Sequence, residues 1–119
     1  MTHCLNLSLI VIRVANVERS AAFYSELGLT FVAEQHGQGP VHYSTQIGPT
    51  LLELYPASKK YPVTSTRLGF TVHSIENIFK RWQQSGYNIC SQTKDSQKNH
   101  TVVQDPDGHR IELIQKPCT

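Results

Sequence analysis

The sequence is that of a short, mildly basic chain. It has 119 residues and a formal net charge of +2, with 17% of the residues charged and 39% hydrophobic. A chain of this length is expected to form one compact domain, which excludes a multidomain enzyme. Its lysines and arginines are scattered, which argues against nucleic acid as a partner. No apolar run reaches the length of a membrane span, so no membrane partner is expected.

The cysteines indicate a reducing compartment. They are odd in number, far apart in the sequence and without a C-x-x-C pair: Cys4, Cys90 and Cys118. This pattern favours neither a disulfide framework nor a zinc knuckle. The first residues also lack a basic leader followed by a small-residue cleavage site. We therefore expect a cytoplasmic protein with reduced thiols.

The first half of the chain predicts a strand, a helix and three further strands. Residues 5–14 (LNLSLIVIRV) are rich in leucine and β-branched residues and predict a strand. Apolar residues at helical spacing then run from Asn16, which can cap the helix start, to Gly28, which can close its end. Three short strands follow, separated by glycine and proline, over residues 29–35, 41–47 and 50–56.

The second half repeats this order after a polar stretch, residues 57–65, which is interpreted as a linker. Residues 67–73 predict a strand, and the helix that follows has Ser74 as its cap and Gly86 at its end. The sequence D-P-D-G at residues 105–108 is typical of a type I turn. Three more strands are predicted over residues 87–92, 99–104 and 109–115.

The two halves align on each other. The segment V-A-N-V-E at residues 14–18 matches V-H-S-I-E at residues 72–76, an offset of about 58 that a single loop insertion raises by one at the last strand. An internal duplication explains this pattern, with modules at residues 5–56 and 66–115 within one domain. Two unrelated α+β halves remain the alternative.

Two segments resemble the vicinal oxygen chelate superfamily, which holds glyoxalase I, extradiol dioxygenases, and bleomycin- and fosfomycin-resistance proteins. The first is IRVANVERSAAFYSELGL at residues 12–29, and the second is QDPDGHRIELIQ at residues 104–115. LLELYP at residues 51–56 also fits. The resemblance implies an α+β fold in which two β-α-β-β-β modules form a curved mixed sheet around a cavity. It also implies a homodimer that completes its cavities across a twofold axis.

The resemblance further implies four metal positions, of which two cannot hold a metal. They fall on Leu9, Glu53, Arg67 and Glu112. Leucine has no lone pair, and a permanently charged guanidinium repels a cation. We therefore expect a degenerate site with no metal and no other cofactor. Arg67 is expected to neutralise Glu112 by bidentate hydrogen bonding.

Strand alternation places Tyr55 on the same face as Glu53, and Arg13 matches a position where glyoxalase-like members hold an anionic part of the substrate. The alternatives are glutamates that point into solvent at a sheet edge and an ordinary surface arginine. The predicted ligand-binding residues are Arg13, Glu53, Tyr55, Arg67 and Glu112.

The histidines are not assigned a role. His42 and His100 lie 58 residues apart in equivalent predicted strands, but a lone strand histidine is typical of ordinary packing or surface positions. His36 and His109 lie in loops or at strand starts and are predicted to be solvated.

These features favour a small-molecule-binding protein that sequesters its ligand without a metal. Three arginines, Arg13, Arg67 and Arg110, outnumber Glu53 and Glu112 on the predicted cavity face. This excess favours an anionic or strongly hydrogen-bonding ligand, whose identity the sequence does not indicate. The alternative is a metal-dependent glyoxalase-like lyase or dioxygenase. A third hypothesis is a catalytically silent domain used for protein contact.

Overall fold

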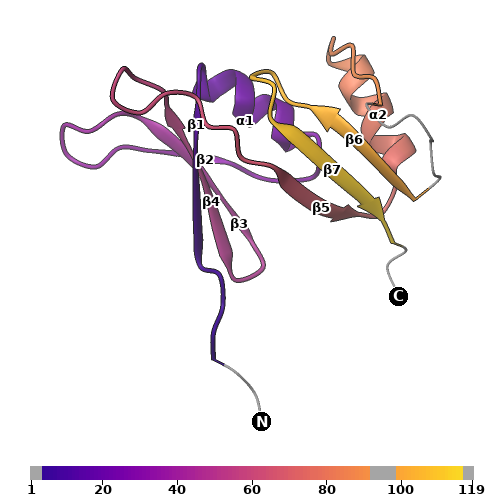
Figure 1. The fold of residues 1–119 in the computed structure, drawn as a ribbon, viewed down its shortest axis with the longest axis horizontal. Helices are drawn as coiled ribbons and strands as arrows, with labels where there is room; N and C mark the ends of the chain where they lie inside the picture. The colour runs from indigo at the N-terminus through magenta and orange to yellow at the C-terminus, as the bar shows by residue number, and fades with distance from the viewer. Residues whose placement is uncertain (1–3, 92–98, 117–119) are drawn as a thin grey trace. The chain divides into compact units, whose positions relative to one another are not determined.

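The computed structural model describes residues 4–91 and 99–116 and has the predicted α+β fold (Figure 1). The chain divides into two compact units, residues 1–64 (unit 1) and residues 65–119 (unit 2). In each unit one helix packs against a small mixed sheet of the same unit. Neither helix in the described residues is long and apolar enough to cross a membrane.

Unit 1 has a four-stranded sheet in the order β1-β4-β3-β2. The outer strand β1 pairs with β4 in parallel, and the other neighbours are antiparallel. Helix α1 connects β1 to β2 and contacts β3 and β4. The elements are β1 (Leu9–Val14), α1 (Val17–Ser25), β2 (Val32–Glu34), β3 (His42–Ile47) and β4 (Thr50–Pro56).

Unit 2 has a three-stranded sheet in the order β5-β7-β6, which repeats the arrangement β1-β4-β3 of unit 1. Again the first strand of the unit pairs in parallel with the last, and the last pairs antiparallel with its other neighbour. Helix α2 contacts β7. The elements are β5 (Leu68–Val72), α2 (Ile75–Gln84), β6 (His100–Gln104) and β7 (Arg110–Gln115).

Both predicted helix caps are present. The Asn16 side chain accepts a hydrogen bond from the backbone N–H of Arg19 at 2.9 Å, and Ser74 Oγ accepts one from the N–H of Asn77 at 3.1 Å. These bonds satisfy donors that the first turn of a helix leaves without partners. Gly28 follows α1 with a φ of +102°, in the left-handed region that glycine adopts without strain.

Strand alternation divides each sheet into a buried and an open face, as the sequence predicts. Leu52 and Leu54 are buried on β4, as Ile111 and Leu113 are on β7, while the glutamates between them remain partly open. The helices cover the apolar faces with large side chains. The helix side chains in the two cores are Phe23 and Tyr24 of α1, and Ile78 and Trp82 of α2.

One predicted strand is not formed in the described residues. Residues 87–91 of the predicted strand 87–92 have no regular structure, and residue 92 lies outside the described part. The backbone N–H of Tyr87 donates to the Trp82 carbonyl at the end of α2, at 2.8 Å. This N–H is therefore not available for the hydrogen bonds that would pair residues 87–91 with a neighbouring strand. Ser91 meets β6 through its side chain, which accepts a hydrogen bond from Thr101 Oγ1 at 2.6 Å.

Candidate ligand-binding site

A pocket of about 360 Å³ opens in unit 1 where the end of β1 meets the segment after β4. Two of the predicted ligand-binding residues, Arg13 and Tyr55, line it. The remaining wall is built from prolines, small residues and a second tyrosine: Pro40, Pro56, Ala57, Ser58 and Tyr61. A concave, mostly apolar wall with one charged group is the usual composition of a small-molecule site.

The Arg13 guanidinium lies over two aromatic rings. Its guanidinium carbon lies 4.9 Å from the centroid of the Tyr55 ring and 4.4 Å from that of Tyr61. The Nη1 group donates a hydrogen bond to the Pro56 carbonyl at 3.3 Å, and the Arg13 backbone N–H donates to Thr64 Oγ1 at 3.2 Å. Stacking and hydrogen bonding therefore fix a cation in one orientation at the pocket wall.

Tyr55 rests on a buried histidine. The rings of Tyr55 and His42 are stacked with centroids 4.2 Å apart and planes only 8° from parallel. The two residues are neighbours across the β3–β4 ladder, one step beyond the Tyr43–Leu54 pair. Tyr55 Oη lies 3.5 Å from His42 Nε2, and the His42 side chain is only 1% exposed. The pocket wall thus has a rigid support beneath it.

Two carboxylates face the same histidine nitrogen. Glu53 Oε2 lies 3.8 Å and Glu34 Oε1 lies 3.7 Å from His42 Nε2. The Glu53 side chain is only 13% exposed. Ser44 Oγ donates a 2.6 Å hydrogen bond to Glu34 Oε1 and so fixes that carboxylate. Unit 1 therefore brings together Arg13, Glu53 and Tyr55 of the predicted set.

The other two predicted residues, Arg67 and Glu112, belong to unit 2 and are paired with each other. The contact is a single one of 3.5 Å between Arg67 Nη2 and Glu112 Oε2, not the expected bidentate pair. The side chains are 58% and 36% exposed. His100 Nε2 donates to the other carboxylate oxygen, Glu112 Oε1, at 3.1 Å. Glu112 is thus occupied by two neighbours of its own unit.

Sequence reasoning missed three residues. Tyr61 lies in the segment interpreted as a linker, and no local pattern indicates that it covers Arg13. His42 could have been suspected because His100 occupies the equivalent position. The expectation that His109 is solvated is wrong: it is 2% exposed, and its Nδ1 lies 2.8 Å from Asp105 Oδ2.

Solved structures with this fold include enzymes and a binding protein. Oxidase ChaP-H2 is 20% identical, with a TM-score of 0.75 and coverage of 97% of this chain and 96% of that one. TnmS3, an antibiotic-binding protein from Streptomyces sp. CB03234, is 22% identical, with a TM-score of 0.72 and coverage of 99% and 100%. The trypanothione-dependent glyoxalase I of Leishmania major is 24% identical, with a TM-score of 0.69 and coverage of 93% and 86%. At these identities the likeness shows the fold alone.

No curated protein sequence gives a significant match to the chain. The model of the glyoxalase/bleomycin resistance protein/dioxygenase superfamily, however, matches residues 3–113. This match includes the whole of the first segment that resembles the superfamily, residues 12–29, and residues 104–113 of the second. The chain therefore belongs to the glyoxalase/bleomycin resistance protein/dioxygenase superfamily.

Proposed function

We propose that the protein binds and sequesters a small anionic or strongly hydrogen-bonding molecule in the unit 1 pocket, with Arg13 as its anchor. The observation that carries this proposal is the contact of the Arg13 guanidinium with the rings of both Tyr55 and Tyr61. Within the described residues its side chain donates one hydrogen bond, to Pro56, so other N–H groups remain for a ligand. A fixed planar guanidinium suits a carboxylate or phosphate.

The residues at the four family metal positions do not fit a divalent metal. Leu9 offers no lone pair and is half exposed on the edge strand β1. Arg67 carries a permanent positive charge, and Glu112 already contacts Arg67 and His100. Lewis-acid chemistry at these positions would need ligands with lone pairs and an open coordination site. The proposed function therefore includes no step through a metal at these positions.

Membership of the superfamily is compatible with two roles, a protein that only binds a small molecule and an enzyme that converts one. TnmS3 is named as an antibiotic-binding protein, whereas ChaP-H2 is named as an oxidase and the Leishmania protein as glyoxalase I. The degenerate metal positions favour the binding role for this chain. A glyoxalase-like lyase or dioxygenase remains the alternative that the experiment must separate.

We also propose that the protein is a homodimer. Strand β1 is the edge of its sheet, and apolar side chains are exposed along it and the residues before it: Leu5, Leu7, Leu9 and Val11. An exposed apolar edge favours pairing with a second copy. The same protein is proposed to work in the cytoplasm, in agreement with the exposed free thiols of Cys4 and Cys90.

The test is a thermal-shift screen with aliphatic and aromatic carboxylates and phosphate esters, carried out in a chelator. Equilibrium dialysis of each hit then measures its affinity. Mass spectrometry, with the chelator and again without it in added Zn²⁺ or Fe²⁺, shows whether the hit is recovered unchanged. Arg13→Ala should weaken binding at least about tenfold, as expected for loss of a charge-assisted hydrogen bond. Arg19→Ala, which removes an exposed arginine of α1 outside the pocket lining, is the matched control and should leave the affinity unchanged.

The outcomes separate the alternatives. Recovery of intact ligand together with a specific effect of Arg13→Ala supports sequestration in the unit 1 pocket. Conversion of the ligand would favour the enzymatic alternative. An equal loss of affinity in Arg13→Ala and Arg19→Ala would show that binding follows net charge and not this pocket.

A further inference from the structure

A cluster of metal-ligating side chains lies on the β2–β3 hairpin, beside Glu53 but not at any of the four family metal positions. It consists of Glu34, His36 and His42, whose ligand atoms all lie within 4.8 Å of one another. We propose that these three residues form a binding site for a divalent transition metal ion such as Zn²⁺. All three ligands come from one hairpin of unit 1, so metal binding can be tested without knowing the proposed ligand.

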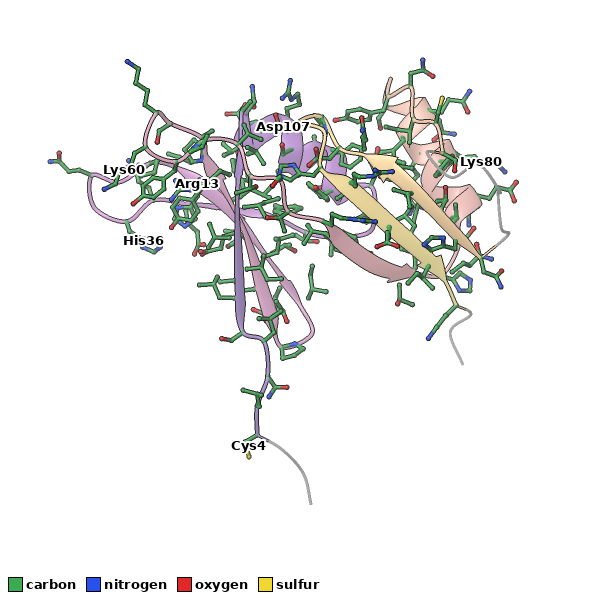
Figure 2. All side chains as sticks on the ribbon, viewed as in Figure 1. Cys4, Arg13, His36, Lys60, Lys80 and Asp107 are labelled. Atoms are coloured by element: carbon green, nitrogen blue, oxygen red, sulfur yellow. The ribbon has the colours of Figure 1, made fainter. Side chains whose placement is uncertain are left out.

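The hairpin itself sets the positions of the ligands. Glu34 and His42 are directly opposite each other in the antiparallel β2–β3 ladder. Side chains opposite each other in such a ladder lie close together on one face. His36 follows in the connecting loop, where a hydrogen bond of 3.0 Å from the Gly39 N–H to the His36 carbonyl closes a turn. The ring centroids of His36, which is labelled in Figure 2, and His42 lie 5.1 Å apart.

The contacts of the buried His42 ring are compatible with metal binding through Nε2. His42 Nδ1 lies 3.4 Å from the Pro40 carbonyl, which can only accept a hydrogen bond. A proton on Nδ1 would donate to this carbonyl and leave the lone pair of Nε2 for a metal ion, which is the tautomer that the proposed site requires. A backbone carbonyl that fixes the second ring nitrogen in this way is the usual arrangement for a metal-binding histidine.

The groups around His42 Nε2 favour a cation electrostatically. Two carboxylate oxygens face this nitrogen, from Glu34 at 3.7 Å and from Glu53 at 3.8 Å. These distances are too long for direct hydrogen bonds. They are close to the separation of about 3.4 Å between two ligands of a tetrahedral zinc ion, so a small side-chain movement would complete the coordination. Glu53 adds a second negative charge that balances a divalent ion.

The ligand types select the class of metal. Two imidazoles and a carboxylate suit Zn²⁺, Ni²⁺, Co²⁺ and Cu²⁺, whereas Mg²⁺ and Ca²⁺ prefer sites made of oxygen alone. The Ser44 hydroxyl, which donates to Glu34 Oε1 at 2.6 Å, orients the carboxylate ligand. Because Tyr55 stacks on His42 and also lines the pocket with Arg13, a bound ion would hold that wall of the pocket in place.

Titration of the chelator-treated full chain with Zn²⁺ by calorimetry, and with Co²⁺ by visible absorption, tests this site. We expect one ion per chain and Co²⁺ absorption bands typical of nitrogen ligands. His36→Ala and Glu34→Gln each remove a ligand from a position that is at least partly exposed, so the variants should fold. Each should weaken binding at least about tenfold.

Two other histidines provide the controls. His73 is exposed in unit 2, and His100 contacts Glu112 in the equivalent part of that unit. His73→Ala and His100→Ala should bind Zn²⁺ as the parent does. Absence of Zn²⁺ binding by the parent, unchanged affinity in both His36→Ala and Glu34→Gln, or loss of binding in His100→Ala would overturn the proposal.

Discussion

The two units place a histidine and a glutamate in the same relation, yet they bury them differently. In unit 1 His42 contacts Glu53, and in unit 2 His100 contacts Glu112, each across an antiparallel pair of strands. The exposed fractions of the side chains are 1% and 13% in unit 1 but 33% and 36% in unit 2. A repeated backbone frame has therefore produced one buried and one open pair.

The difference comes from what covers each histidine. In unit 1 strand β2 lies beside β3 and brings Glu34 opposite His42, while the Tyr55 ring stacks on the imidazole. In residues 65–91 and 99–116 no strand pairs with the outer side of β6, and Ile114 occupies the place opposite His100. The covering strand and ring, more than the shared pair, determine burial.

Unit 2 buries a different histidine, in the turn that precedes β7. The side chains of His109 and Asp105 are both fully buried. Asp105 Oδ1 accepts hydrogen bonds from the backbone N–H groups of Asp107 and His109 at 2.9 and 2.8 Å, and Oδ2 accepts from His109 Nδ1 at 2.8 Å. The Asp105 carboxylate thus stabilises the turn, so we assign the group formed by Asp105, Asp107 and His109 a structural role.

The largest effect is expected from Asp105→Ala. The change leaves three donors without their carboxylate acceptor in a buried turn, so the free energy of unfolding should fall by about 3 kcal/mol or more. Asp105→Asn keeps one oxygen as an acceptor and should lose less. Urea unfolding followed by circular dichroism measures both. A loss below about 1 kcal/mol in the alanine variant would contradict the structural role of this turn.

The next largest effect on the free energy of unfolding is expected from the buried one of the two sheet histidines, His42 and His100. His42→Ala removes a buried ring from beneath Tyr55 and should lower the free energy of unfolding by about 2–3 kcal/mol. His100→Ala removes a partly exposed ring from a solvated contact and should cost less than about 1 kcal/mol. Both are measured by urea unfolding in a chelator, so that no metal contributes. Equal losses would show that the greater burial of His42 does not increase its contribution to the free energy of unfolding.

Much of the fold could be predicted because its determinants are local. The Asn16 and Ser74 caps depend on hydrogen bonds three residues away, and the buried faces of β4 and β7 follow the two-residue period of a strand. The superfamily resemblance and the α+β fold class are likewise confirmed.

The details of the site depend on contacts between residues distant in the sequence. Tyr61 covers Arg13 because the segment after β4 turns back on β1, where the Thr64 N–H donates to the Arg13 carbonyl. No residue pattern in that polar segment indicates this. The burial of His42 likewise depends on Tyr55 from another strand and on the neighbouring strand β2.

The smallest expected effect concerns the missing ring in unit 2. Ile114 lies opposite His100 on the same face of β7 as Glu112, so Ile114→Tyr would recreate the stacked pair of unit 1. A cross-strand aromatic pair contributes about 0.5 kcal/mol, and the ring current should move the His100 ring proton resonances upfield in NMR spectra. Ile114→Leu, which keeps the apolar area without a ring, is the control and should leave those resonances nearly unmoved. If the tyrosine variant behaves like the leucine variant, a ring alone does not organise the pair, and the difference between the units must be attributed to the covering strand.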